Sequence, residues 1–275
     1  MIFKQPAAAT PPWDAVTPHA AQVAVTAVTG SLVALTLVFT LVMWRKRGTP
    51  LYLFILLGGA LAIFNEPRLD LVSQIYFPWR ESWTVFEAYG RTIPVWGVMS
   101  YTLYFGTLTL TAVELLRNGA TRTKFWLVVL GVWVLNSCLE VTMLNTGIYF
   151  YFGEQPLRIG LFPAVWLVLN DIGVVLAATI ILRLRPFFTG ARVALAAIVP
   201  PIAQEVGLWF GTPHFMLVSS DQSYALKTAG SLVSIVAGLL AVNFLIKFAC
   251  LGEKGGTPVK AQTPATSDAE PITAR

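Results

Sequence analysis

Seven long apolar runs, separated by short polar connections, constrain the fold of this 275-residue chain more than any other feature. Each run is close to the roughly 20 residues that a helix needs to cross about 30 Å of hydrocarbon. The runs cover residues 21–44, 51–75, 93–116, 125–149, 161–183, 191–211 and 226–249. Hydrophobic residues make up 56% of the chain and charged residues 12%, a composition typical of membrane proteins. The sequence therefore predicts an all-α, polytopic membrane protein, built as a single bundle of seven transmembrane helices.

The two ends of the chain differ from the runs in composition. Residues 1–20 are rich in Pro and Ala and predict a flexible lead; they lack the basic and short apolar regions of a signal peptide. Residues 251–275 are polar and rich in Pro, Thr and Ala, which predicts a disordered tail. The transmembrane domain is therefore expected over residues 21–250.

Basic residues gather on one side of the predicted bundle. They follow the first, third, fifth and seventh runs: Arg45, Lys46, Arg47, Arg117, Arg122, Lys124, Arg183, Arg185, Arg192, Lys247 and Lys254. Short cytoplasmic loops carry an excess of Lys and Arg, so we expect the N-terminus outside and the tail in the cytoplasm, in the cell membrane or an endomembrane. The same clustering explains the formal net charge of +5 without nucleic acid as a partner.

Five carboxyl groups lie deep inside the runs at similar depth. Glu66, Glu140 and Glu205 are each about 15 residues, or roughly 22 Å, from the cytoplasmic start of their runs. Asp171 is about ten residues from the outer start of its run, and Asp70 is one turn beyond Glu66. Acidic side chains inside a membrane are costly, which makes them functional-site candidates. We therefore predict one polar cavity in the outer half of the membrane, lined by all five.

Such a cavity suits acid–base chemistry, because a protonated carboxyl beside an ionised one can act as general acid and base. The five carboxyls are the catalytic candidates. Amide, aromatic and basic residues near them are expected to bind the substrate: Asn65, Arg91, Trp96, Tyr101, Asn136, Tyr149, Trp166 and Asn170. Structural interpretations stay open, since single acids often satisfy a neighbouring helix and aromatic residues often form an interfacial belt.

Three segments have a distinctive composition: Glu66-Pro67-x-x-Asp70, Phe-Glu-Ala-Tyr-Gly-Arg-Thr-Ile-Pro-Val-Trp at 86–96, and Tyr-Phe-Tyr-Phe-Gly-Glu-Gln-Pro-Leu at 149–157. Together they resemble the AveC-like spirocyclase family over roughly residues 60–215. These membrane proteins are known from spiroketal formation in avermectin-type polyketides, and some members are associated with dehydration. The resemblance implies a reaction class rather than a substrate.

Spiroketal closure of a lipophilic polyketide dihydroxyketone needs an acid, a base and stabilisation of an oxocarbenium ion, so no cofactor or metal is expected. We expect Glu66 or Glu140 to donate the proton, Asp70 and Asp171 to stabilise positive charge, and Glu205 to assist. The expected partners are this lipophilic small molecule and membrane lipid.

Two other classes stay open. A membrane-bound terpene or meroterpenoid cyclase would use a buried acid to open an epoxide or protonate an alkene. A proton-coupled transporter of a small lipophilic solute would use the acids as a relay, although the odd number of runs and the lack of a visible repeat disfavour it. A retinal protein is disfavoured because Lys227 and Lys247 lie at the ends of the last run, and haem because His19 and His214 are expected near the outer surface.

Overall fold

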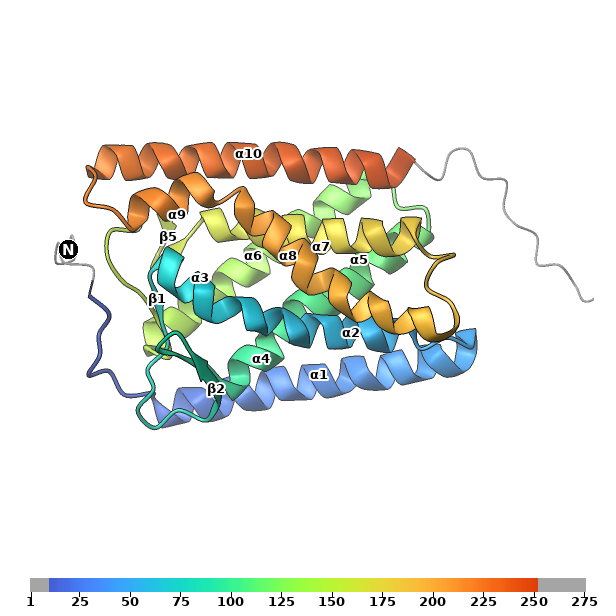
Figure 1. Ribbon diagram of the computed structural model, residues 1–275, viewed down its shortest axis with the longest axis horizontal. Helices are drawn as coiled ribbons and strands as arrows, with labels where there is room; N and C mark the ends of the chain where they lie inside the picture. Colours follow the sequence, from blue (N-terminus) through green and yellow to red (C-terminus); the bar gives the residue numbers. More distant parts are fainter. Residues whose placement is uncertain (1–9, 252–275) are drawn as a thin grey trace, which may run out of the picture.

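The computed structural model describes residues 10–251, which are mostly helical. Figure 1 shows the long helices side by side along the long axis, with the short strands at one end. Six helical stretches in the described part are long and apolar enough to cross a membrane: His19–Arg47, Leu51–Ser73, Arg122–Thr146, Val165–Arg183, Gly190–Trp209 and Tyr224–Cys250. The chain therefore has the helices of an all-α membrane protein. Of the predicted tail, residues 252–275 lie outside the described residues.

The first long helix, α1 (His19–Arg47), begins inside the predicted flexible lead. The residues just before it are attached to the strand-bearing end of the bundle: Val16 pairs with Arg80, and the Thr17 hydroxyl donates a hydrogen bond to the Pro78 carbonyl, 2.9 Å away. The described part of the lead is therefore held in place by contacts far along the chain.

The second run consists of α2 (Leu51–Leu61), the 3₁₀ segment η1 (Ala62–Asn65) and α3 (Glu66–Ser73). Pro67 lies in the first turn of α3, where a missing backbone N–H costs no intrahelical hydrogen bond. The interruption that Pro67 predicts thus appears as a 3₁₀ turn before α3, and it makes Glu66 the first residue of a new helix.

The third run is helical but interrupted, and is not among the six stretches named above. It contains α4 (Val95–Tyr101), the π-helical segment η2 (Thr102–Thr107) and α5 (Leu108–Arg117). η2 packs closely against α2. A Cβ atom on Gly59 would lie 2.3 Å from the Gly106 nitrogen, so a side chain at Gly59 would separate the two backbones.

The sixth run begins as the 3₁₀ segment η3 (Gly190–Ile198) and continues as α8 (Val199–Trp209). Pro200 lies in the first turn of α8, so the predicted break falls at this change of helix type. The short helix α9 (Thr212–Val218) and the long helix α10 (Tyr224–Leu251) complete the bundle.

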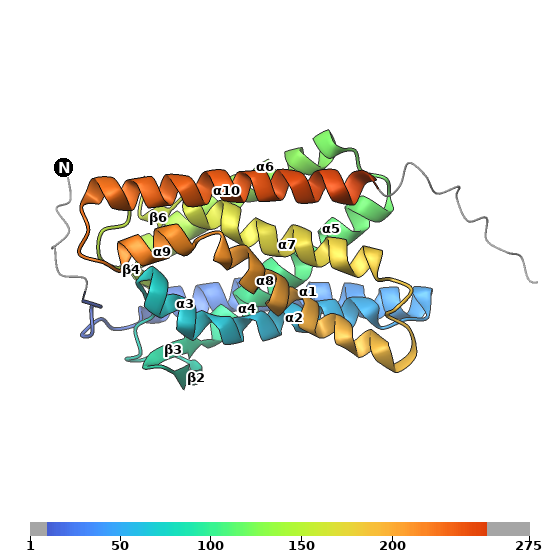
Figure 2. The ribbon, with the colours of Figure 1, turned by 45° about the horizontal axis from the view of Figure 1, so that its top comes forward.

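The central helix is α7 (Val165–Arg183), most of whose residues are buried. It packs against α5, α8 and α10, and in both ribbon views it lies inside the bundle (Figure 1 and Figure 2). At its crossing with α8, a Cβ on Gly207 would lie 2.6 Å from the Leu169 carbonyl oxygen, so the two backbones almost touch. Small residues at helix crossings are typical of membrane bundles. α6 (Arg122–Thr146) and α1 are instead exposed along most of their length.

Three two-stranded antiparallel sheets lie in the connections between helices, and the prediction of an all-α chain did not include them. β1 pairs with β4, β2 with β3, and β5 with β6. Their bounds are Ile75–Tyr76 (β1), Thr84–Ala88 (β2), Arg91–Pro94 (β3), Phe150–Tyr151 (β4), Arg158–Ile159 (β5) and Phe162–Pro163 (β6). The β1–β4 pair brings the second and fourth helical runs together at the strand-bearing end.

The opposite end of the bundle is rich in cations, and we call it the basic end. It contains the last turn of α1, with Arg45, Lys46 and Arg47, together with Arg117 at the end of α5 and Lys124 at the start of α6. The strand-bearing end and the basic end therefore have different chemistry.

Candidate functional site

α3 presents two buried carboxyls one helical turn apart. Glu66 is 6% exposed and Asp70 is 0% exposed. Both lie near the strand-bearing end, where α3 meets η1, β1, β3 and α9. An ionised group is rarely buried without a partner. The residues that surround these two side chains are therefore taken as the candidate site.

A chain of hydrogen bonds holds Glu66. The Tyr101 hydroxyl, at the end of α4, donates to the Glu66 carboxylate and accepts from the Gln204 side-chain amide at 3.3 Å. Asn65 donates to the Gln204 side-chain oxygen at 2.9 Å and to the Pro201 carbonyl at 3.1 Å. Three separate helical runs thus fix one carboxyl. Tyr101 is therefore hydrogen-bonded to Glu66 directly, and Asn65 is connected to it through Gln204 and Tyr101.

Asp70 differs from Glu66 because no hydroxyl, amide or guanidinium group among the described residues donates to its oxygens, and the Glu66 carboxyl is the group within hydrogen-bond reach. Its electrostatic neighbours are Glu66 and the buried guanidinium of Arg91. Arg91 also has two unpartnered nitrogens, Nε and Nη1, within the described part of the chain. Unpaired buried polar atoms cost free energy, so Asp70 and Arg91 each have unused capacity to bind a polar molecule.

The hairpin of β2 and β3 positions Arg91. Its turn residues, Tyr89 and Gly90, have φ angles of 53° and 67°, as in the tight turns that match the twist of a two-stranded ribbon. Arg91 follows directly and is 7% exposed, and its guanidinium lies 5.8 Å from the ring centre of Phe152. Burial lowers the pKa of Arg91, an effect that the nearby Asp70 carboxylate opposes.

Glu140 and Asp171 are connected through Tyr104, whose hydroxyl lies close enough to both for their charges to act on it. Glu140, on α6, accepts a hydrogen bond from the Tyr149 hydroxyl and lies close enough to Glu66 for their charges to interact. Asp171, on α7, is 3% exposed, and both its oxygens are occupied: Tyr104 donates to one at 3.0 Å and the Trp133 indole to the other. We call Glu66, Asp70, Glu140 and Asp171 the carboxyl cluster.

Tyr151, on β4, lies among the members of this cluster. Burial raises the pKa of the Tyr151 phenol well above its usual range, and the charges of Glu140, Glu66 and Asp70 raise it further. Tyr151 therefore stays protonated and can donate a hydrogen bond. It was not among the predicted binding residues, although it belongs to the Tyr-Phe-Tyr-Phe segment that marks this part of the sequence.

Glu205, predicted in the same layer, lies apart from the carboxyl cluster. It pairs with Arg68 on the outside of the bundle, where the two side chains are 29% and 51% exposed. Its neighbour Gln204 faces inward instead. Successive residues on a helix are rotated by about 100°. Glu205 therefore lies at nearly the same level along α8 as Gln204, but on a different face of the helix.

The predicted aromatic residues divide into two groups. Trp96, Tyr149 and Trp166 are buried, and Phe77 links the first two with ring centres 5.5 Å from each. The Trp166 indole N–H has no hydrogen-bond partner among the described residues. These rings form an apolar wall beside the carboxyl cluster. Other aromatic residues at this end are exposed and fit an interfacial belt: Trp79, Trp83 and Trp209.

The predicted amides are less uniform. Asn136 has a buried side-chain nitrogen without a hydrogen-bond partner in the described part of the chain. Asn170 is partly exposed, next to Asp171 on α7. A small cavity of about 30 Å³ touches Asp171 and is otherwise lined mainly by apolar side chains of α5, α6 and α7. It has room for about one water molecule.

The predicted binding residues did not include Gln204, Tyr104, Tyr151 or Trp133. The first three lie at the same end of the sequence runs as the acids, whereas Trp133 was not among the residues expected there. Trp133 lies seven residues before Glu140, which places both on one face of α6. Tyr104 follows Tyr101 by three residues, again on one side of a helix. Helical spacing from a predicted acid was therefore the available signal.

His214 lies on α9, at the strand-bearing end of the bundle (Figure 1). It is 0% exposed on α9, and its Nδ1 lies 2.7 Å from the Ser231 hydroxyl of α10. Because Ser231 donates its own proton to the Lys227 carbonyl at 2.9 Å, Nδ1 must donate and Nε2 is left as an acceptor. Burial lowers the pKa of His214 to about 4.

Within residues 10–251, no group of three or more His, Cys, Asp or Glu side chains is arranged to hold a metal ion. The chain matches no protein-family model, no curated protein and no solved structure. The chemistry of the site therefore has to be inferred from its own side chains. They offer a carboxyl held by a phenol, a carboxyl without donors, a buried guanidinium and an apolar wall.

Proposed function

We propose that this protein is an integral-membrane enzyme that uses the carboxyl cluster for acid–base catalysis on a lipophilic substrate. One observation supports this above the others. Asp70 is completely buried, no hydroxyl, amide or guanidinium group among the described residues donates to its oxygens, and the Glu66 carboxyl lies within hydrogen-bond reach one turn away. A carboxylate without such donors can take a proton, or accept a hydrogen bond, from a substrate hydroxyl without first giving up another hydrogen bond.

The proposed roles follow from the contacts. Glu66, held by Tyr101, is the proton donor, and Asp70 is the base, with Arg91 close enough to favour its charged form. Glu140 and Asp171 are each held by hydroxyl or indole donors and stabilise positive charge from the other side. The buried aromatic wall holds the apolar part of the substrate and can stabilise a cation through its ring faces.

The reaction that fits these roles best is spiroketal formation from a polyketide dihydroxyketone. One hydroxyl first adds to the ketone to give a hemiketal. Glu66 then protonates the hemiketal hydroxyl, which leaves as water and creates an oxocarbenium ion. The second hydroxyl attacks this ion, and Asp70 takes its proton, so one water is lost overall. The segments around Asp70, Arg91 and Tyr151 resemble AveC-like spirocyclases, which supports this class. Dehydration, with which some members of that family are associated, is the alternative reaction.

The proposal includes seven crossings with the strand-bearing end outside. The interrupted stretch from Val95 to Arg117 would supply the seventh crossing. The basic end would face the cytoplasm, in line with the preference of Lys and Arg for that side.

The test uses protein reconstituted in lipid nanodiscs and a long-chain dihydroxyketone. Uncatalysed closure gives equal amounts of mirror-image spiroketals, so an excess of one enantiomer measures the enzyme-catalysed reaction. We expect Glu66→Gln and Asp70→Asn to lower the rate at which this excess forms by about 100-fold or more. Glu87→Gln, which changes an exposed carboxyl on β2, serves as the matched control. Full activity in both cluster variants would disprove the proposed roles.

The same preparation separates the rival classes. Cyclisation of an epoxy-prenyl substrate without activity on the dihydroxyketone would indicate a terpene-type cyclase. Uptake of an unchanged solute into proteoliposomes would indicate a transporter.

A further inference from the structure

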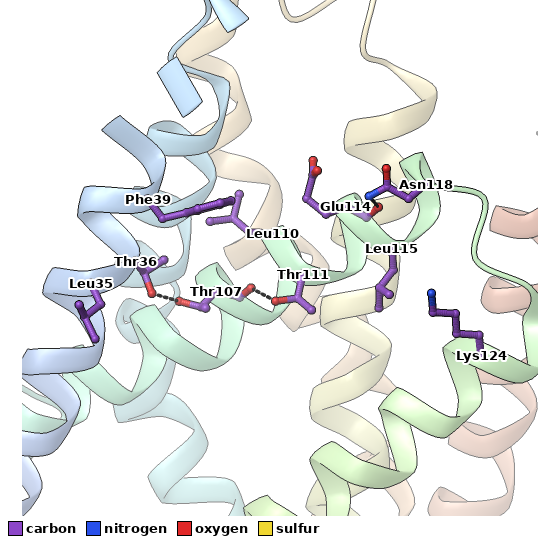
Figure 3. Close-up of a pocket in the computed structure, with 10 residues that line it drawn as sticks. All are labelled: Leu35, Thr36, Phe39, Thr107, Leu110, Thr111, Glu114, Leu115, Asn118 and Lys124. Carbon is purple, nitrogen blue, oxygen red and sulfur yellow. Dashed lines mark hydrogen bonds between the residues drawn. The ribbon is translucent and has the colours of Figure 1, made fainter. Parts of the chain in front are cut away.

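A groove lies at the basic end of the bundle, away from the carboxyl cluster (Figure 3). It has a volume of about 490 Å³, within the range of small-molecule sites. α5 forms its floor, α1 one wall, and the first turn of α6 the other. It opens between helices rather than into the core, so a ligand would enter it from the side.

The walls of this groove are apolar along most of its length. Leu35 and Phe39 of α1 are 66% and 42% exposed, Leu110 of α5 lies beside Phe39, and Leu115 lies on the side of Lys124. The hydroxyls in the groove bond within the protein. Thr107 donates to Thr36 at 3.2 Å, and the other threonine of the floor, on α5, donates to a carbonyl of its own helix. Their methyl groups therefore add to an apolar lining suited to a hydrocarbon chain.

One end of the groove is positively charged. The Glu114 carboxylate lines it, but Arg47 binds both of its oxygens, at 2.8 and 2.9 Å, and Arg117 binds one at 3.1 Å. Two guanidinium groups thus outweigh the one acid. Lys124 adds a third cation, and its ammonium group makes no ion pair with the described residues. Lys124 lies in the first turn of α6, which is the positive end of the helix dipole. That turn contains no acidic residue to offset the positive charge.

We propose that this groove binds one membrane phospholipid with an anionic headgroup. The phosphate contacts Lys124, and one acyl chain lies along Leu35, Phe39 and Leu110. The argument is charge complementarity, since excess positive charge lies at one end of an apolar channel that opens to the side. Basic pockets between membrane helices recognise anionic lipid headgroups for this reason. The proposal does not depend on the reaction proposed for the carboxyl cluster.

The test is photo-crosslinking of the full-length protein in nanodiscs. The probe is phosphatidylglycerol with a photoreactive group in one acyl chain, and phosphatidylcholine with the same chain is the comparison. We expect phosphatidylglycerol to label the peptides that contain Phe39 and Leu110 several times more than phosphatidylcholine does. Lys124→Gln should lower this labelling by about fivefold. Lys247→Gln, which changes an exposed lysine on α10, should leave it unchanged.

A second variant tests the acyl channel separately. Thr111 is exposed on the groove floor and its hydroxyl bonds only within its own helix, so Thr111→Phe should fill the channel without unfolding the protein. Labelling of these peptides by both lipids should then fall to background. Equal labelling by the two lipids, or equal effects of the Lys124 and Lys247 substitutions, would show only general attraction of anionic lipid to a basic surface and would overturn the proposal. Unchanged labelling in Thr111→Phe would do the same.

Discussion

The Tyr101 hydroxyl donates a hydrogen bond to the Glu66 carboxylate and thereby joins α4 to the first turn of α3. The same hydroxyl accepts from Gln204 of α8. One phenol thus connects three helical runs at the point where the proposed proton donor lies, and its removal separates the role of this contact from that of the carboxyl itself.

Replacement of Tyr101 by Phe should lower the rate of spiroketal formation by about tenfold to 100-fold. The Tyr101 hydroxyl stabilises the carboxylate that Glu66 becomes once it has given up its proton, and a hydrogen bond to a charged group contributes about 1.5–3 kcal/mol. The ring, and hence its packing against Phe105 at 5.2 Å, is retained. Nanodisc assays of turnover check this, with Tyr224→Phe as a control because that tyrosine is 55% exposed. Equal rates in the two variants would show that the Tyr101 hydroxyl has no part in catalysis.

Arg91 and Asp70 should behave as a coupled pair in stability measurements. Arg91→Met leaves Asp70 buried without its compensating cation, which should lower the free energy of unfolding by about 3 kcal/mol. Asp70→Asn should restore much of this loss when the two changes are combined. Thermal unfolding in detergent of the two single variants and the double variant measures the coupling. Simple addition of the two losses would mean that Arg91 does not compensate Asp70.

His214 should make the protein sensitive to mild acid. Burial lowers its pKa to about 4 from an ordinary value of 6.5, so between these values the unfolded chain binds a proton that the folded protein does not. Stability is therefore lost as the pH falls below 6.5, by about 3 kcal/mol at most near pH 4.

The measurement is the unfolding temperature between pH 7 and pH 4.5, for the natural protein and for His214→Gln. We expect the variant to be less stable at pH 7 but to lose less stability on acidification. His19→Gln is the control, because that histidine lies on the exposed first turn of α1. Parallel pH profiles for all three proteins would rule out His214 as the source.

Gly59 should tolerate no side chain. A Cβ there would lie 2.3 Å from the Gly106 backbone nitrogen, so Gly59→Ala should lower the free energy of unfolding by about 1–3 kcal/mol. Gly131 on α6 is the matched control, because a Cβ there meets nothing within 4 Å and alanine is the better helix former. Thermal unfolding of the two alanine variants checks this, and equal stability would contradict the close crossing of α2 and η2.

The helices were predictable because hydrophobicity and length are properties of contiguous sequence. The predicted run 51–75 corresponds to Leu51–Ser73, and 161–183 to Val165–Arg183. The pairing of β1 with β4 was not predictable, because each strand has two residues and its partner lies in a distant connection. Short non-local pairings leave no periodic signal in a sequence.

The candidate site was predictable in depth but not in direction. Rise along a helix places Glu66 and Glu205 at one level from residue counts alone. Which face meets a neighbour depends on how the helices pack, and that packing turns Gln204 inward and Glu205 toward Arg68. The groove at the basic end was missed for the same reason, since α1, α5 and α6 contribute to it from separate parts of the chain.

The wide π-helical turn η2 begins directly after Tyr101 and contains Tyr104. These two phenols serve different acids, Glu66 and Asp171. Such turns are rare and are often found where a protein works. A regular helix here would rotate Tyr104 relative to Tyr101, so the two phenols could not both keep their present acids. The width of this one turn is what lets neighbouring residues on one stretch of chain bind carboxyls of two different helices.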